Sequence, residues 1–135
     1  DSHAYKELGM EIARAVQDLK RQVVIIASSD MTHYEPQETA REKDEQAIAA
    51  ILELDEDALL KQIEELRISM CGSAPVVSLI SAARELGAGP IVMLGLSHEE
   101  NRFALARAFG AELILDSEGP TGTLRRAAAE AVPVL

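Results

Sequence analysis

Three side chains in two polar loops could together bind a metal ion. Asp30 and His33 lie in the loop 28–36, and Cys71 lies in the turn 71–73. A carboxylate, an imidazole nitrogen and a thiolate form a mixed donor set that suits zinc or a similar divalent ion. Each loop follows an apolar run, so we expect both at the carboxyl edge of neighbouring parallel strands, where ligands bind in open α/β sheets.

Other interpretations of these residues stay open, because the sequence contains no CxxC or HxxxH pair. In the simplest one, Asp30 caps a turn, His33 is a polar loop residue and Cys71 is a small buried hydrophobe. In another, Cys71 is a nucleophile activated by a helix N-terminus, with His33 as its base. The charged residues Glu38, Glu42, Asp44 and Glu45 are interpreted as one solvated helix face.

A second candidate site is the turn formed by Gly72, Ser73 and Ala74. This turn directly precedes a predicted helix, and free N–H groups at a helix N-terminus attract phosphate and other anions. The turn could therefore bind a nucleotide or an anion weakly.

The elements that must position these residues follow from hydrophobic periodicity. Continuous apolar runs predict buried parallel strands, whereas apolar residues three and four apart predict amphipathic helices. The strands are expected near 22–28, 67–70, 90–95 and 112–116, and the helices near 4–19, 37–54, 56–66, 74–86, 98–109 and 123–132. This alternation predicts a three-layer αβα sandwich with a parallel sheet of about four strands, similar to Rossmann and flavodoxin folds.

Local signals support several helix boundaries. Asp55 is a good N-cap for the helix that follows it, and Gly87 can adopt the left-handed conformation that often ends a helix. In the first helix we expect an inward apolar face made of Leu8, Ile12, Ala15, Val16 and Leu19.

Composition restricts the classes of partner. The 135 residues suit a single α/β domain, and the net charge of −10 argues against binding to nucleic acid or to an anionic membrane. No apolar run approaches the roughly 20 residues of a membrane span, no signal peptide is visible, and the single cysteine suits a reducing, cytoplasmic compartment. An unpaired sheet edge would favour a homodimer.

From about residue 5 to 88 the chain resembles the Memo family, whose fold is like that of class III extradiol dioxygenases. The matching strings are YKELGMEIARAV, VVIIASSDMTHYEP and ISMCGSAPVVSLISAARELGA. The resemblance implies a metal pocket that uses the His of SSD-x-x-H and the Cys of S-x-C-G, which are His33 and Cys71 here. Asp30 lies beside His33 in the same motif, and the histidines of the family's N-terminal half have no counterpart in this sequence.

From about residue 87 to 131 the chain is similar to the coenzyme domain of medium-chain, zinc-type alcohol dehydrogenases, on the string ARELGAGPIVMLGLSHEENRFALARAFGAELILDSEG. Two of the three expected fingerprint glycines are replaced, and the segment 95–98 lacks the acidic residue that holds the ribose, so we expect no NAD. Two resemblances in one chain suggest an engineered or recombined chimera, a folded scaffold without native enzymatic activity whose junction lies near residue 88. The alternatives are a residual metal-binding protein, whose only cofactor would be a divalent ion, and a weak nucleotide or anion binder.

Overall fold

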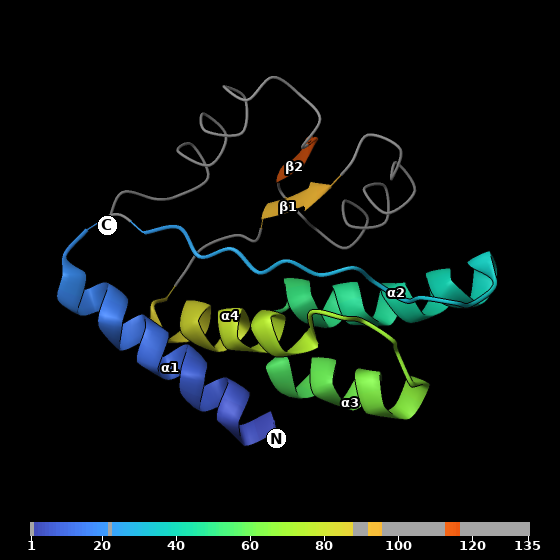
Figure 1. Cartoon of the computed structure of the whole chain (residues 1–135), viewed down its shortest axis with the longest axis horizontal. Coiled ribbons are helices and arrows are strands. Elements are labelled where there is room, and N and C mark those ends of the chain that lie inside the picture. Colours follow the sequence, from blue (N-terminus) through green and yellow to red (C-terminus); the bar gives the residue numbers. More distant parts are fainter. Residues whose placement is uncertain (1, 22, 88–91, 96–112, 117–135) are drawn as a thin grey trace. The chain divides into compact units, whose positions relative to one another are not determined.

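The computed structural model describes residues 2–21, 23–87, 92–95 and 113–116. The chain divides into two compact units, Asp1–Ala88 and Gly89–Leu135 (Figure 1). The described part of the first unit contains the helices α1 (Ser2–Leu19), α2 (Gln37–Leu52), α3 (Glu56–Leu66) and α4 (Ser73–Glu85). The second unit contains the strands β1 (Val92–Gly95) and β2 (Leu113–Asp116). That residues 1–135 form a single domain stays a prediction.

The predicted αβα sandwich with a four-stranded parallel sheet is wrong. Between residues 2 and 87 the described chain is helical and contains no strand. The one sheet among the described residues has two strands, β1 and β2, which pair in parallel with Val92 opposite Leu113 and Gly95 opposite Asp116. The predicted helices 98–109 and 123–132 lie outside the described residues.

The predicted strand 22–28 is replaced by an extended segment that is not part of a sheet. Side chains along residues 23–30 alternate between half-buried and exposed, and the apolar Val24 and Ile26 are 53% and 74% exposed. A strand requires a neighbouring strand for its backbone N–H and C=O groups. Among the described residues no backbone-to-backbone hydrogen bond joins this segment to another one, so the β-branched run is extended without forming a ladder.

The predicted strand 67–70 is instead the continuation of a helix end. Arg67 caps α3 with a left-handed backbone (φ 51°), and the N–H of Ile68 donates to the carbonyl of Ile63 at 3.0 Å. These bonds fix residues 67 and 68 to α3 rather than to a sheet, and the short stretch that follows leads directly into the turn at Cys71.

The helix predictions within residues 2–87 are confirmed, because their signals are local. The N–H of Ala58 donates to the side chain of Asp55 at 2.8 Å, which is the predicted N-cap of α3. Gly87 has the predicted left-handed backbone after α4, with φ 61°. Ile48, Leu59, Val77 and Ile80, from α2, α3 and α4, are the largest fully buried side chains of the described core.

Helix α1 packs on α4 through a face that overlaps the predicted one only in part: Ile12 and Val16 are half-buried, but Ala15 is exposed. Gly9 and Ala13 are buried, whereas Leu8 and Leu19 are each 54% exposed. A Cβ at Gly9 would lie 2.4 Å from the carbonyl oxygen of Ser78, so the two helices approach more closely than any larger residue allows. Hydrophobic periodicity missed this face because close helix packing selects small residues rather than apolar ones.

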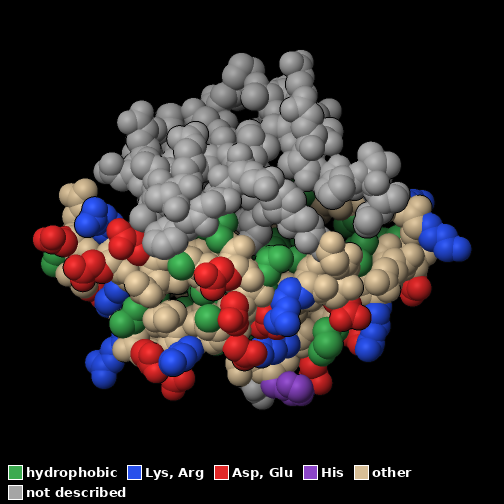
Figure 2. Space-filling model, turned by 180° about the vertical axis from the view of Figure 1, so that it is seen from behind, with side chains coloured by type: hydrophobic (Ala, Val, Ile, Leu, Met, Phe, Trp, Pro, Cys, Tyr) green, Lys and Arg blue, Asp and Glu red, His purple; other side chains and the backbone are tan. Residues whose placement is uncertain are grey.

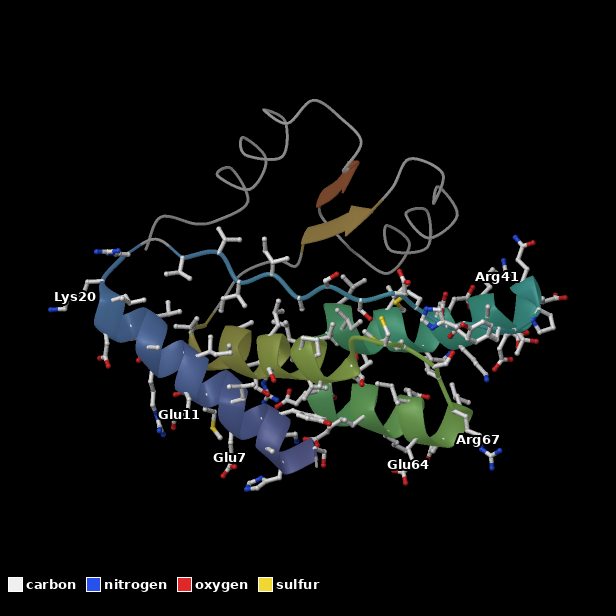
Figure 3. All side chains as sticks on the ribbon, viewed as in Figure 1. Glu7, Glu11, Lys20, Arg41, Glu64 and Arg67 are labelled. Carbon is white, nitrogen blue, oxygen red and sulfur yellow. The ribbon has the colours of Figure 1, made fainter. Side chains whose placement is uncertain are left out.

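Most charged side chains of the helices are exposed, but Asp44 and Glu56 are buried. Arg84 of α4 pairs with Glu56 of α3 at 2.7 Å, and this hydrogen bond raises the pKa of Arg84. Acidic and basic side chains are interspersed over the face in Figure 2, and labelled residues such as Glu7, Glu11 and Glu64 point away from the helices in Figure 3. No helix in the described part is long and apolar enough to cross a membrane. Homodimer formation and the absence of nucleic-acid binding stay predictions.

Candidate metal centre

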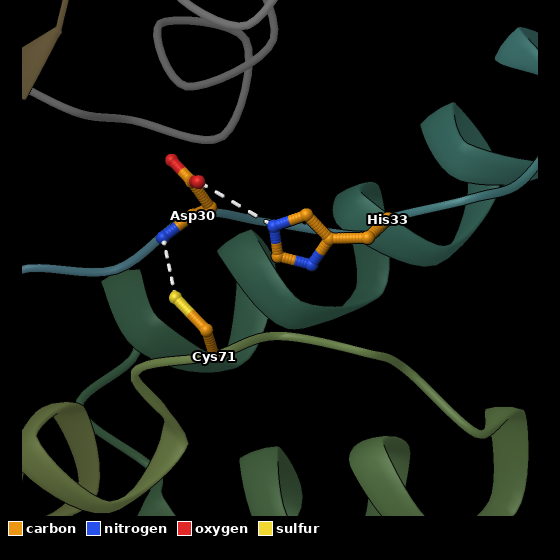
Figure 4. A group of neighbouring side chains, drawn as sticks. All are labelled: Asp30, His33 and Cys71. Carbon is orange, nitrogen blue, oxygen red and sulfur yellow. Dashed lines mark hydrogen bonds and ion pairs between the residues drawn. The ribbon is translucent and has the colours of Figure 1, made fainter.

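The extended segment and the turn before α4 bring Asp30, His33 and Cys71 together (Figure 4). Each residue offers one potential ligand atom, and the three atoms lie within 4.8 Å of one another. Asp30 and Cys71 are exposed and His33 is partly buried, so the group is open to solvent on one side. The three residues come from two segments that are about forty positions apart in the sequence.

The imidazole of His33 lies between Asp30 and Ser69. Its Nε2 is 3.4 Å from Oδ2 of Asp30, and its Nδ1 is 2.8 Å from the carbonyl oxygen of Ser69. The backbone N–H of His33 donates to Oγ of Ser69 at 2.7 Å, and this hydroxyl donates to the carbonyl of His33 at 3.1 Å. The sequence analysis missed Ser69, although its position two residues before Cys71, in the S-x-C-G motif, could have indicated it.

The thiol of Cys71 is held against the opposite side of Asp30. The backbone N–H of Asp30 donates to Sγ of Cys71 at 3.2 Å, as the dashed line in Figure 4 shows. Next to it, Oγ of Ser29 donates to the carbonyl of Asp30 at 2.7 Å and accepts the N–H of Gly72 at 2.9 Å. These bonds join the two segments on both sides of the candidate metal ligands.

The loop that carries His33 is anchored to α2 by a buried carboxylate. Asp44 is 3% exposed, and its Oδ1 accepts the backbone N–H of the buried Thr32 at 2.9 Å. An ion pair between Lys43 and Glu35 joins the same helix to the far end of the loop. The assignment of Asp44 to a solvated helix face is therefore wrong. Asp44 lies within a run of charged residues, and the sequence pattern does not distinguish a buried member of such a run from the exposed ones.

Comparison with known proteins identifies the family. The sequence profile of the family described as Memo-like protein matches residues 1–104, which is more than three quarters of the chain. This chain belongs to the Memo-like protein family. It is 48% identical over 82 residues to the MEMO1 family protein MJ0403 of Methanocaldococcus jannaschii, a match that covers 61% of this chain and 29% of that protein. It is 43% identical over 89 residues to a MEMO1 family protein of Pyrobaculum arsenaticum, covering 66% of this chain and 32% of that one.

The chain thus spans about a third of the length of the curated Memo relatives that it matches. No solved structure matches it. The chimera hypothesis is wrong, because the Memo match continues to residue 104, well past the proposed junction near residue 88. Nothing in the comparisons supports an alcohol dehydrogenase coenzyme domain, and the chain is accordingly not an engineered scaffold assembled from two enzymes.

The turn at Gly72 allows Cys71 to approach Asp30. A Cβ at Gly72 would lie 2.4 Å from both the carbonyl oxygen of Ser28 and the Cβ of Ser29, a separation that real side chains essentially never show. The N–H of Gly72 is already bonded to Ser29. In the turn formed by Gly72, Ser73 and Ala74, the backbone N–H of Gly72 is therefore not available to bind an anion.

Substitution Gly72→Ala is expected to weaken metal binding at this site by about tenfold or more, because displaced supporting groups typically cost 10–100-fold in metal affinity. The added methyl group would push residues 71–73 away from Ser28 and Ser29, and Sγ of Cys71 would move with them. Isothermal titration with Zn²⁺ measures the change. Gly87→Ala is the matched control, since its Cβ would meet nothing within 4 Å and its left-handed backbone affects only the end of α4. Equal zinc affinity in both variants would contradict this expectation.

Proposed function

We propose that this Memo-like chain binds a divalent metal ion of the zinc class through Asp30, His33 and Cys71. The observation that carries the proposal is the convergence of three different donor atoms, oxygen, nitrogen and sulfur, within 4.8 Å of one another. Around zinc such atoms lie about 2.0–2.3 Å from the ion, which places them roughly 3.4–3.7 Å apart in a tetrahedral site. Small side-chain movements would therefore bring the three ligands to bonding distance.

The chemistry of the three groups favours a cation between them. An ionised carboxylate only accepts hydrogen bonds, and the thiolate is the form of cysteine that binds metals. Because metal binding removes the thiol proton, Asp30 and Cys71 would together supply two negative charges to a bound divalent ion, which neutralises both.

The donor set also restricts which ions fit. Sulfur and imidazole ligands suit zinc, cobalt and similar transition metals, whereas magnesium and calcium prefer oxygen ligands alone. Three protein donors leave one position of a tetrahedral site for water or another small ligand, as in catalytic rather than structural zinc sites. The exposure of Asp30 and Cys71 is consistent with such an open position.

Titration of the metal-free chain with Co²⁺ tests the proposal, because a thiolate bound to cobalt gives an intense charge-transfer absorption band. We expect saturation at one ion per chain with this band present. Cys71→Ser should abolish the band, and Mg²⁺ in large excess should not displace the cobalt. The absence of any binding, or a spectrum unchanged by Cys71→Ser, would refute the site.

A further inference from the structure

We infer that Ser69 is a positioning residue that holds His33 in the Nδ1–H tautomer, with the lone pair of Nε2 facing Asp30 and Cys71. The inference concerns the same site and therefore rests on the proposed metal binding, but it makes a separate statement about the metal-free protein. Nothing in the sequence had assigned a role to Ser69.

The contact between the imidazole and Ser69 determines the tautomer. The Nδ1 atom of His33 lies 2.8 Å from the carbonyl oxygen of Ser69, and a carbonyl oxygen can only accept a hydrogen bond. Nδ1 must therefore carry the hydrogen. In the neutral ring the lone pair then belongs to Nε2, which is the nitrogen 3.4 Å from Oδ2 of Asp30.

The Nδ1–H tautomer is the less stable form of an isolated neutral imidazole side chain, so a specific contact must stabilise it in the protein. An isolated neutral imidazole side chain favours the Nε2–H form, and that hydrogen could be donated to Asp30. The carbonyl of Ser69 instead selects the form whose Nε2 is a metal ligand. Metal-bound histidines generally donate their other N–H to a carbonyl or a carboxylate in this way, which fixes the ring and its tautomer.

The hydroxyl of Ser69 keeps its carbonyl in the correct place. Oγ of Ser69 accepts the backbone N–H of His33 at 2.7 Å and donates to the backbone carbonyl of His33 at 3.1 Å. Two hydrogen bonds from the Ser69 side chain thus fix the backbone of His33 against residue 69. The third hydrogen bond, from the His33 ring to the carbonyl of Ser69, depends on this alignment of the two backbones. Removal of Oγ would therefore remove both of these bonds to the backbone of His33.

The test compares Ser69→Ala with Ser69→Thr and Ser78→Ala. Threonine retains the hydroxyl and should rescue the site. Ser78 is the matched control, because its Oγ donates to the carbonyl of Tyr5 at 2.8 Å between α1 and α4, away from the metal ligands. The tautomer is measured by ¹⁵N–¹H correlation of the histidine rings in metal-free protein at about pH 8.5, two units above the ordinary histidine pKa of about 6.5. His33 is assigned by its loss in His33→Ala.

We expect the Nδ1–H tautomer of His33 in the wild type, in Ser69→Thr and in Ser78→Ala, and a shift toward Nε2–H in Ser69→Ala. The affinity of Ser69→Ala for Co²⁺ should be 10–100-fold weaker than that of the wild type, the usual effect of losing an outer-shell partner. If the role of Ser69 were purely structural, Ser69→Ala would lower the thermal stability and leave the tautomer of His33 unchanged. This is the result expected for Ser78→Ala.

Two kinds of failure are distinguishable. An Nε2–H tautomer in the wild type, or an unchanged tautomer in Ser69→Ala, would overturn the role of Ser69 whether or not metal binds. If the wild-type chain bound no Co²⁺ but showed the Nδ1–H tautomer and lost it in Ser69→Ala, the positioning role would stand and the proposed function would fail.

Discussion

Substitution His33→Ala is expected to abolish tight metal binding, with a loss of affinity larger than the 10–100-fold typical of outer-shell changes. The side chain contributes the only nitrogen ligand of the group, and its removal leaves a carboxylate and a thiolate on two separate segments. An exposed pair of this kind holds a zinc-class ion poorly, because the protein would provide only two of the four ligands of a tetrahedral site. Competition titration of Co²⁺ or Zn²⁺ against a chelator measures the loss.

The control for this experiment is His3→Ala. Nε2 of His3 lies 3.2 Å from Glu7 on the exposed face of α1, so it is also a histidine beside a carboxylate. It belongs to no group of three potential ligands in the described part of the chain, and we expect its removal to leave the affinity unchanged. A similar loss in both variants would show that the ion binds nonspecifically to surface histidines, and the proposed site would then be abandoned.

The candidate ligands were predictable from residue type and loop position, but the reason for their convergence was not. The sequence predicts Asp30, His33 and Cys71 at the carboxyl edge of neighbouring strands. In the structure, their proximity comes from contacts of Ser29 with Gly72 and of Ser69 with His33. Side-chain-to-backbone bonds between segments about forty residues apart leave no periodic pattern in a sequence, so Ser69 and Asp44 went unnoticed.

The helices of the first unit were predictable because their causes are local, whereas the lack of strands among its described residues was not. The N-cap at Asp55 and the left-handed Gly87 act within one helical turn of their own residues. A β-branched run such as residues 23–27 indicates an extended backbone, yet a sheet also requires a second segment to complete the ladder. That requirement cannot be read from the run itself, which is why extended backbone was mistaken for a sheet.

The chimera hypothesis failed for a related reason. Residues 84–98 read as a helix end, a glycine, an apolar run and a polar turn, a sequence of features shared by many α/β proteins. A likeness that rests on such shared features does not identify a family, and the comparisons support the Memo family instead. The strings around His33 and Cys71 are more specific, because they combine site residues with the glycine and serine that their geometry requires.

Substitution Asp44→Ala is expected to lower the free energy of unfolding by about 1.5–3 kcal/mol, the usual contribution of a buried hydrogen bond to a charged group. Thr32 is buried, and without Oδ1 of Asp44 its backbone N–H would lose this acceptor. Metal affinity should fall as well, because Thr32 lies directly before His33 and within the segment that carries Asp30. Urea unfolding and Co²⁺ titration of the same preparation measure both effects.

Asp44→Asn separates the hydrogen bond from the charge. The amide oxygen of asparagine can still accept the N–H of Thr32, so this variant should retain most of the metal affinity. Glu45→Ala is the neighbouring control, since Glu45 forms a long ion pair of 3.7 Å with Arg41 within α2 itself. If Asp44→Ala lost stability but bound Co²⁺ as tightly as Glu45→Ala, the anchoring of the loop by α2 would be irrelevant to the site. The contacts of Ser69 and Gly72 would then suffice to hold the three ligands together.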